Sequence, residues 1–289
     1  GQLIAQHKGG FTPFEADVTA LLRPGETALL TVACDNRVNH STLPVGNEDG
    51  QLAFFGSDNA GIPSVEAAKR AAAPQNRPNF DFFNYAGIHR PVVLYTTPKE
   101  YIEDVTVVPH TDGRVDYRIQ TVGTAPVAVT VLEADGKAVA SAEGTEGTLT
   151  IPEVQLWEPK PGVPYLYTLH ITCGADVYDQ TFGVRSVEVR GTQVLLNGKP
   201  LYFKGFCKHE DFTAHGRGFD PVLNVKDVNL IHWANANAVR TSHYPYAEEF
   251  YDLCDREGIL VMDETPAVGI GGGAVLNPYK EYPIAEHHR

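Results

Sequence analysis

The sequence is poor in the residues that build disulfide frameworks and metal sites. Its 289 residues include four cysteines, which are far apart and form no Cys-x-x-Cys pair: Cys34, Cys173, Cys207 and Cys254. A chain of this length can bury a core large enough to fold without disulfide bonds. We therefore expect reduced, mostly buried thiols, no metal site and no cofactor, and we favour a cytoplasmic location.

Positive charge and long apolar runs are also scarce. Lys and Arg number 23 against 36 Asp and Glu, which gives a formal net charge of −13. Nucleic-acid binding depends on a basic surface that releases counterions, so no nucleic-acid partner is expected. No apolar run approaches the roughly 18 residues of a membrane span, so no membrane partner is expected either.

Methionine occurs once, at Met262, so we expect that Gly1 is not a translation start. Arg289 closes no recognisable element. We expect the chain to be part of a longer protein, in which case a missing signal peptide says nothing about export.

The first region, residues 1–98, alternates short apolar runs with turn residues. The runs 27–36 and 90–97 have the composition of strands. A long polar insertion covers residues 46–78, and connections of that length are usually functional or mobile.

The second region, residues 99–187, shows a clear period of two. In the run 115–121, Val115, Tyr117 and Ile119 alternate with polar residues, which is typical of a half-buried strand. The dipeptide Asp135-Gly136 between two alternating runs predicts a hairpin. About seven short strands in this span indicate an immunoglobulin-like β-sandwich.

The third region, residues 188–289, changes to an alternation of strands and helices. Asn197-Gly198 predicts a hairpin whose second arm is an apolar strand, and apolar strands are also expected in "NAVRTS" and "ILVMDE". This order predicts parallel pairing, and we interpret it as the first three strands of a (β/α)8 TIM barrel.

Two helices separate these strands, and Gly258 is expected to end the second. The inward stripe of the first is predicted to contain Leu223, Leu230 and Ala234. For the second helix we expect apolar residues inward and acidic residues outward: Ala247, Phe250, Tyr251 and Cys254 against Glu248, Glu249, Asp252 and Asp255.

Polar residues follow each of the three predicted barrel strands: "KHED" (208–211), "SHYPY" (242–246) and "DET" (263–265). In such barrels the site lies at the carboxyl ends of the strands, so these residues are expected to converge there. Structural roles stay open for each of them. His243 could be structural, the run 209–211 could be a solvated loop, and Glu264 could be the partner of a barrel-interior Arg such as Arg240.

Several long runs resemble glycoside hydrolase family 2. The first region carries "GGFTPFEADVT" and "NYAGIHRPVVLYTTP", which look like the jelly-roll sugar-binding domain of that family. "LWEPKPGVPYLYTL" and "FGVRSVEVRGTQVLLNGKPLYFKGF" look like the exit from its middle domain and its first barrel strand. "KHEDFTAHGRGFD", "ANAVRTSHYPYAEEF" and "DREGILVMDETPAVG" are similar to the β-glucuronidases within the family.

The resemblance covers nearly the whole chain and implies a multidomain β plus α/β architecture. It consists of a jelly-roll sugar-binding β-sandwich in residues 1–98, an immunoglobulin-like β-sandwich in residues 99–187 and the start of a TIM barrel in residues 188–289. The first unit is expected to be incomplete at its start and the last at its end.

The function implied is that of an exo-acting retaining β-glucuronidase that hydrolyses β-D-glucuronides and forms a homo-oligomer at full length. Retaining hydrolysis needs a pair of carboxyl groups. In the family both glutamates come later than Arg289, so no catalytic residue is expected here and this chain alone is expected to be inactive. The only Asn-Glu dipeptide, Asn47-Glu48, lies in the polar insertion and is discarded.

The substrate-binding residues that the resemblance implies are Asp81 of "FDFFNYAG" and His243 of "SHYPY", and His209 is expected to shape the same pocket. Two alternatives remain. One is another family 2 glycosidase, a β-galactosidase or β-galacturonidase, and the other is a non-catalytic carbohydrate-binding protein.

Overall fold

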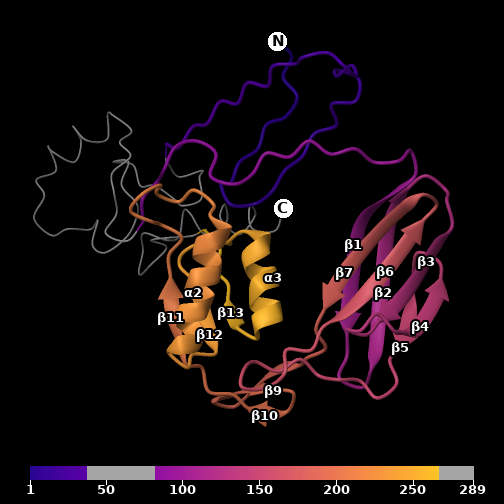
Figure 1. Cartoon of the computed structure of the whole chain (residues 1–289), viewed down its shortest axis with the longest axis vertical. Coiled ribbons are helices and arrows are strands. Elements are labelled where there is room, and N and C mark those ends of the chain that lie inside the picture. Colours follow the sequence, from indigo (N-terminus) through magenta and orange to yellow (C-terminus); the bar gives the residue numbers. More distant parts are fainter. Residues whose placement is uncertain (38–81, 267–289) are drawn as a thin grey trace, which may run out of the picture.

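The middle of the chain forms two antiparallel sheets that lie apart from the helices (Figure 1). The computed structural model of the protein describes residues 1–37 and 82–266. One sheet has the order β1-β2-β5, with β1 at Tyr101–Pro109, β2 at Arg114–Val122 and β5 at Glu146–Thr150. The other has the order β4-β3-β6-β7, with β3 at Val127–Leu132, β4 at Ala138–Glu143, β6 at Tyr167–Cys173 and β7 at Asp176–Phe182.

The alternating pattern of this region places its core as predicted. Val115, Tyr117 and Ile119 of β2 are buried with residues of β3 and β6 in one apolar cluster. Asp135 and Gly136 lie in the turn that joins β3 to β4, as expected for this hairpin. The immunoglobulin-like sandwich is therefore confirmed, whereas the boundaries after residues 98 and 187 stay predictions.

A small sheet connects the sandwich to the helical region. It contains β8 (Val187–Arg190), β9 (Gln193–Leu196) and β10 (Lys199–Pro200). Asn197 has a φ of 52° and Gly198 a φ of 74°, so both central residues have the positive φ of a tight hairpin turn.

The second arm of this hairpin is shorter than predicted. Strand β10 ends at Pro200, and the apolar strand β11 begins at Gly205. The break arises because the Lys204 carbonyl accepts hydrogen bonds from the N–H groups of Asn237 and Ala238. The chain thus leaves the hairpin at this point, and β11 pairs with residues 238–241.

The last part of the structure is a parallel three-stranded sheet with two helices against it (Figure 1). The sheet order is β11 (Gly205–Lys208), β12 (Ala238–Thr241) and β13 (Leu260–Met262), and the helices are α2 (Pro221–Trp233) and α3 (Glu248–Glu257). Gly205 permits the close pairing, because a Cβ there would lie 2.3 Å from the Ala238 carbonyl oxygen. The strand–helix–strand prediction for the barrel is confirmed.

The face that α2 buries differs from the prediction. Its buried residues are Asn224, Val228 and Ile231, whereas Leu230 is 50% exposed and Ala234 is exposed as well. The helix carries apolar residues on more than one side, so the 3.6-residue period does not select a single face. Asp220 caps the helix by accepting from the N–H groups of Val222 and Leu223.

The second helix follows the prediction more closely. Phe250 and Cys254 are fully buried, and Gly258 ends the helix with a φ of 70°. Asp255 is expected to face outward but is half-buried. The sandwich region approaches the helix here, since the Trp157 indole donates a 2.8 Å hydrogen bond to the backbone carbonyl oxygen of Asp255. Burial raises the pKa of the Asp255 carboxyl.

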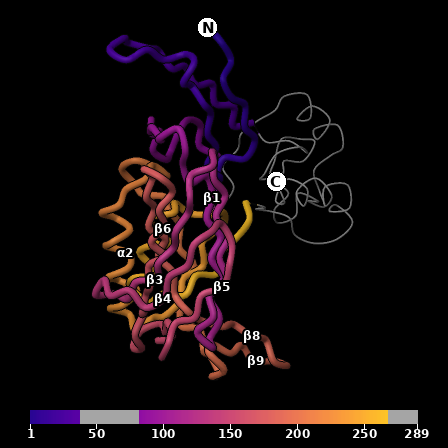
Figure 2. The backbone as a smooth tube through the Cα atoms, turned by 90° about the vertical axis from the view of Figure 1, so that its right-hand side faces the viewer, coloured from indigo at the N-terminus to yellow at the C-terminus, as the bar shows by residue number. Residues whose placement is uncertain are grey.

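The expected strands of the first region are not formed in the described residues. Neither residues 27–36 nor residues 90–97 pair into a ladder. In Figure 2 the amino-terminal residues, coloured indigo, form an extended loop at one end of the molecule. Leu29 is 92% exposed and Leu94 is 73% exposed. A strand needs a hydrogen-bonded neighbour, and no described segment supplies one.

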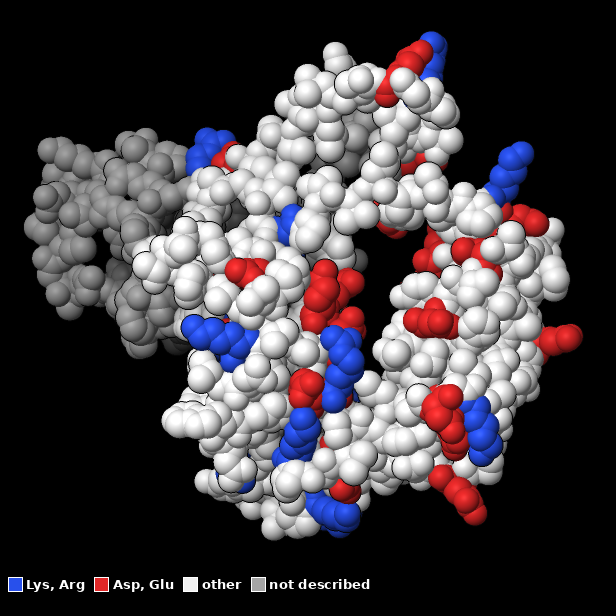
Figure 3. Space-filling view, in the orientation of Figure 1, with Lys and Arg blue, Asp and Glu red and all other residues white. Residues whose placement is uncertain are grey.

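The cysteines and charges complete the description. All four cysteines are free; Cys173 and Cys254 are buried, but Cys34 and Cys207 are exposed, so the expectation of mostly buried thiols is wrong for those two. No helix in the described ranges is long and apolar enough to cross a membrane. On the face displayed in Figure 3, basic side chains are scattered among acidic ones.

Candidate functional site

The segment that starts at Phe82 runs across the region that follows the barrel strands. The N–H of Phe219 donates to the His89 carbonyl oxygen at 2.8 Å, and the Arg217 guanidinium donates to the Phe83 carbonyl oxygen at 2.7 Å. These contacts join parts of the chain that are more than a hundred residues apart in sequence. Residues 82–89 therefore form one wall of the barrel's strand-end surface.

Arg90 strengthens this junction. Its guanidinium donates to the carbonyl oxygen of Phe11 at 2.6 Å and to that of Pro245, which follows strand β12. It also lies 3.9 Å from the Glu210 carboxylate, and both side chains are largely buried. One arginine thus connects the first region, the β11 end and the β12 end.

Arg217 lies in a box of aromatic rings and is only 5% exposed. Its guanidinium carbon is 4.4 Å from the ring centroid of Tyr244, and three further rings lie within 5.4 Å: Phe11, Phe82 and Tyr85. Such rings attract a cation through their negative faces. The box fixes the 82–85 segment against Tyr244, the residue next to His243.

The centre of the strand-end surface is a cluster of Arg240, His243 and Glu264. Arg240 donates to Glu264 Oε1, and His243 Nδ1 lies 3.1 Å from Glu264 Oε2. Arg240 Nη2 is 3.4 Å from the same His243 nitrogen. The pairing of Glu264 with Arg240, one of the alternatives that the sequence left open, is therefore present.

His209 joins this cluster from the end of β11. Its ring lies edge-on to that of His243, with 5.3 Å between the centroids. The two predicted histidines thus come together from strands β11 and β12, although their substrate-binding roles stay predictions.

Asp263 faces a different set of groups. Its Oδ1 accepts from the Thr241 hydroxyl at 2.8 Å and from the Tyr251 hydroxyl at 2.7 Å. The two neighbouring carboxylates at the end of β13 therefore have different partners. Asp263 links the strand to helix α3 through Tyr251, and Glu264 contacts Arg240 and His243.

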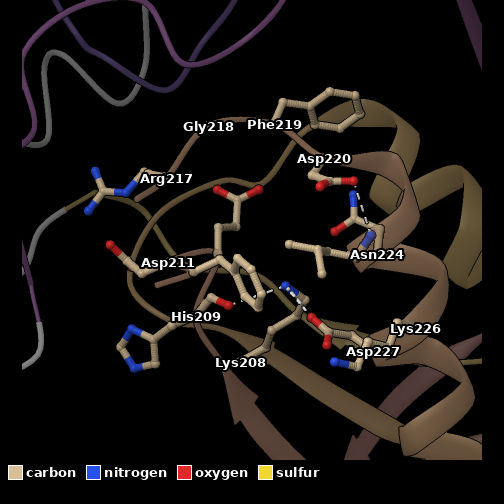
Figure 4. Close-up of a pocket in the computed structure, with 13 residues that line it drawn as sticks. Lys208, His209, Asp211, Arg217, Gly218, Phe219, Asp220, Asn224, Lys226 and Asp227 are labelled. Carbon is tan, nitrogen blue, oxygen red and sulfur yellow. Dashed lines mark hydrogen bonds and ion pairs between the residues drawn. The ribbon is translucent and has the colours of Figure 1, made fainter. Parts of the chain in front are cut away.

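A cavity of about 160 Å³ lies beside this cluster, between α2 and the connection that leads to it (Figure 4). At its floor the Lys208 ammonium pairs with Asp227 at 2.9 Å and donates to the His209 carbonyl oxygen. In Figure 4, Asp220, Asn224 and Asp227 lie on the α2 side, while His209 and Arg217 lie on the other side. Lys208 is therefore a structural cation of the cavity floor.

Burial changes the titration of several groups around the junction. It raises the pKa of Glu210, although Arg90, Lys208 and Arg217 oppose the change. It lowers the pKa of His89 to about 4, assisted by the positive charge of Arg90 and Arg217. His89 is therefore neutral at neutral pH. Its backbone carbonyl accepts from the Phe219 N–H, and its ring lies 5.8 Å from the Phe11 ring, measured between centroids.

The remaining predicted site residue, Asp81, lies outside the described residues. Its neighbour Phe82 is 1% exposed and packs edge-on against Tyr244, with 6.2 Å between the ring centroids. Within the described ranges no group of three or more possible metal ligands occurs.

Sequence reasoning missed Arg90 and Arg217. The resemblance drew attention to the runs that contain them, "NYAGIHRPVV" and "HGRGFD", but a single arginine in such a run carries no periodic or spacing signal. Their contacts cross 155 and 134 positions of sequence, which local patterns cannot report.

Chemically, the strand-end surface can bind and orient a polar ligand. Imidazole, guanidinium and carboxylate groups converge there, but the Glu264 carboxylate is already held by two partners. The described part of the chain thus offers hydrogen-bonding groups that neighbouring side chains hold in place.

Comparison with known proteins covers all three regions. Residues 1–98 match the family model "Glycosyl hydrolases family 2, sugar binding domain", residues 95–185 match "Glycosyl hydrolases family 2", and residues 187–286 match "Glycosyl hydrolases family 2, TIM barrel domain". A β-glucuronidase of Paenibacillus borealis is 44% identical over 305 aligned residues, which cover 100% of this chain and 48% of that protein.

Solved structures give the same result. The β-glucuronidase of Faecalibacterium prausnitzii is 91% identical with a TM-score of 0.89, and the match covers 100% of this chain and 48% of that one. The Bifidobacterium dentium β-glucuronidase complexed with coumarin-3-O-glucuronide is 48% identical with a TM-score of 0.79, covering 93% of this chain and 47% of that one.

The chain therefore spans about half the length of the relatives that it matches. The three family models together cover it from residue 1 to residue 286, in the order that its folded regions follow. The chain belongs to glycosyl hydrolase family 2.

Proposed function

We propose that this chain is the amino-terminal part of a retaining β-glucuronidase that removes a terminal β-D-glucuronic acid from its substrate. The observation that carries the proposal is the high identity, over the whole chain, to a solved β-glucuronidase. A related structure is described as a complex with a glucuronide, which supports a small-molecule or oligosaccharide glucuronide as the substrate.

The proposal assigns the bond-breaking groups to the part of the enzyme that follows residue 289. Retaining hydrolysis uses one carboxyl group as acid and base and a second as nucleophile, about 5–5.5 Å apart. Asp263 and Glu264 are both engaged with neighbouring side chains, so neither is offered for these roles.

The contribution of this chain is to bind and orient the sugar. We assign hydrogen bonds with sugar hydroxyl groups to His243 and Asp81, and we assign His209 to the wall of the same pocket. The edge-on contact between the two histidines supports a shared pocket, and the packing of Phe82 on Tyr244 supports the participation of the preceding aspartate.

The test is the hydrolysis of p-nitrophenyl glycosides by the protein extended to the length of its relatives. The β-D-glucuronide is expected to react at least about 10²-fold faster in kcat/KM than the β-D-glucoside, because a site built to pair a polar group rejects a ligand that lacks it. The glucoside is the matched control, since it differs only at the carboxylate. Preference for the β-D-galactoside or β-D-galacturonide would indicate another family 2 activity, and binding without hydrolysis would indicate a carbohydrate-binding protein.

Asp81→Asn in the extended protein is expected to lower kcat/KM by about 10-fold to 10²-fold. A carboxylate that accepts a hydrogen bond from a sugar hydroxyl makes a charge-assisted contact, which the neutral amide weakens. Asp81→Ala is expected to have a larger effect. The measurement is steady-state kinetics with the p-nitrophenyl glucuronide, together with the melting temperature, which should change little.

Asp17→Asn serves as the control for this variant. Asp17 is an exposed aspartate of the same region whose carboxylate accepts a hydrogen bond from the Thr19 N–H at 2.8 Å. Equal kinetic effects of the two substitutions would remove the substrate-binding role from Asp81. Homo-oligomerisation and a cytoplasmic location of the whole protein stay predictions.

A further inference from the structure

The Glu264 carboxylate uses its two oxygens for two different side chains. Oε1 accepts from Arg240, and Oε2 lies 3.1 Å from His243 Nδ1. The side chains of His243 and Glu264 are 16% and 25% exposed, so the contact is largely shielded from water. Ion pairs and hydrogen bonds are stronger in such places than on the surface.

We infer that Glu264 is a positioning residue that sets the tautomer and the ring orientation of His243. The inference deepens the proposed function, because it rests on the assignment of His243 to sugar binding. Glu264 acts through the imidazole and makes no contact with the substrate itself.

The tautomer follows from the chemistry of the two neighbours. A carboxylate oxygen only accepts hydrogen bonds, so Nδ1 must carry the proton to interact favourably with Oε2. Arg240 Nη2 only donates and would favour the opposite tautomer, but it is farther away, at 3.4 Å against 3.1 Å. Arg240 also has the Glu264 carboxylate as its principal acceptor.

The consequence for His243 concerns its second nitrogen. When Nδ1 carries the proton in the neutral imidazole, Nε2 is the acceptor of the ring. A hydrogen bond on one ring nitrogen also fixes the plane of the ring, as is known for histidines in catalytic and metal sites. Glu264 thereby decides whether His243 offers a lone pair or an N–H through Nε2.

The position of Glu264 does not depend on this carboxylate. Its backbone N–H donates to the Thr241 hydroxyl at 3.1 Å, and that hydroxyl donates to Asp263 at 2.8 Å. The end of β13 is therefore anchored to β12 through other groups. A substitution that changes only the Glu264 side-chain head should leave the backbone in place.

Glu264→Gln is the informative substitution. The amide has one acceptor oxygen for two donors, and Arg240, which carries a full charge, is expected to take it. The amide NH₂ then faces His243 Nδ1 and can only donate, which moves the imidazole proton to Nε2. The variant thus reverses the hydrogen-bonding role of Nε2 with almost no change in volume.

The experiment is a double-mutant cycle in the protein extended to the length of its relatives. Glu264→Gln is expected to lower kcat/KM for the p-nitrophenyl glucuronide by about 10-fold to 10²-fold, by analogy with the loss seen when the hydrogen-bond partner of a metal-binding histidine is removed. In the His243→Ala background the same substitution is expected to change kcat/KM by less than about threefold, because the group through which it acts is absent. Full additivity of the two effects would overturn the inference.

Glu257→Gln is the matched control. Glu257 Oε2 also contacts a cation and a histidine, with Lys160 Nζ at 2.8 Å and His232 Nε2 at 3.3 Å, but it lies at the carboxyl end of α3. This variant is expected to keep kcat/KM within about twofold of the wild type. An equal loss in Glu257→Gln would show that the kinetic effect is a general result of removing a glutamate charge that pairs with a cation and a histidine.

Two readouts separate this inference from the proposed function. Wild-type activity with the glucuronide tests the function, and the cycle can use whichever p-nitrophenyl glycoside the enzyme hydrolyses best. A neutron diffraction structure of the Glu264→Gln variant locates the imidazole proton and tests the inference even without activity. A proton that stays on His243 Nδ1 would overturn it.

Discussion

Expressed by itself, the 289-residue chain is expected to release no p-nitrophenol from any p-nitrophenyl glycoside. A retaining mechanism needs a protonated carboxyl group and a free carboxylate on either side of the scissile bond. At the end of β13, the Asp263 and Glu264 carboxylates are both engaged by neighbouring side chains. At the end of β11, the largely buried Glu210 side chain lies 3.9 Å from Arg90. The loss should be complete, because the proposed function places this carboxyl pair after residue 289.

The isolated chain is also expected to associate with itself. The parallel sheet β11-β12-β13 has two edge strands, and edge strands with unpaired backbone groups pair readily with other chains. Phe206 on β11 and Met262 on β13 are 52% and 55% exposed, which adds apolar surface to these edges. Light scattering and size-exclusion chromatography of the isolated chain measure this association.

The protein extended to the length of its relatives is the control for both measurements, and it should be soluble and active. A soluble, monodisperse preparation of the 289 residues that releases p-nitrophenol above the blank would contradict the prediction. In that case a carboxyl pair within this chain would have to perform the chemistry.

Much of the fold follows from signals that span few residues. The alternation of Val115, Tyr117 and Ile119 predicts a strand buried on one face, because side chains alternate across a pleated sheet. Asn197 and Gly198 predict a tight turn, because both residues tolerate the positive φ that the turn requires. The parallel order of the barrel strands follows from the helices between them.

Other features depend on contacts that the sequence pattern does not contain. The apolar residues of α2 lie on more than one side, so packing alone selects Val228 and Ile231 and leaves Leu230 exposed. The run 90–97 has strand composition but no ladder partner among the described residues. Composition measures the preference for a pleated surface and not the presence of a neighbouring strand.

The candidate site, too, has one feature that the sequence predicts and another that it does not. Its location was predictable, because polar residues follow three strands whose carboxyl ends must lie at one edge. The division of work between Asp263 and Glu264 was not predictable, since the two are adjacent and chemically alike. The two residues differ only in the direction of their side chains. Asp263 contacts Thr241 and Tyr251, whereas Glu264 contacts Arg240 and His243.

His243→Ala in the extended protein is expected to lower kcat/KM for the p-nitrophenyl glucuronide by roughly 10²-fold or more. A positioned polar group that hydrogen-bonds the sugar or a catalytic carboxylate contributes on this scale. The structure supports the choice of residue, because His243 is held by Glu264 and lies edge-on to His209. Steady-state kinetics and the melting temperature are the two measurements.

His232→Ala is the matched control for this substitution. His232 is also partly buried and contacts a glutamate, Glu257, at 3.3 Å, but it lies in the last turn of α2. The control is expected to leave kcat/KM within about twofold of the wild type, although it can lower the melting temperature.

The two measurements together separate the functional from the structural role of His243. A structural histidine that only filled space and satisfied Glu264 would lower the melting temperature when removed and leave kcat/KM of the folded enzyme unchanged. A histidine that binds the sugar would lower kcat/KM even where the protein stays folded, because the lost interaction is made with the substrate. Wild-type kinetics in a stably folded His243→Ala enzyme would therefore return this residue to a structural role, and the positioning role of Glu264 would fall with it.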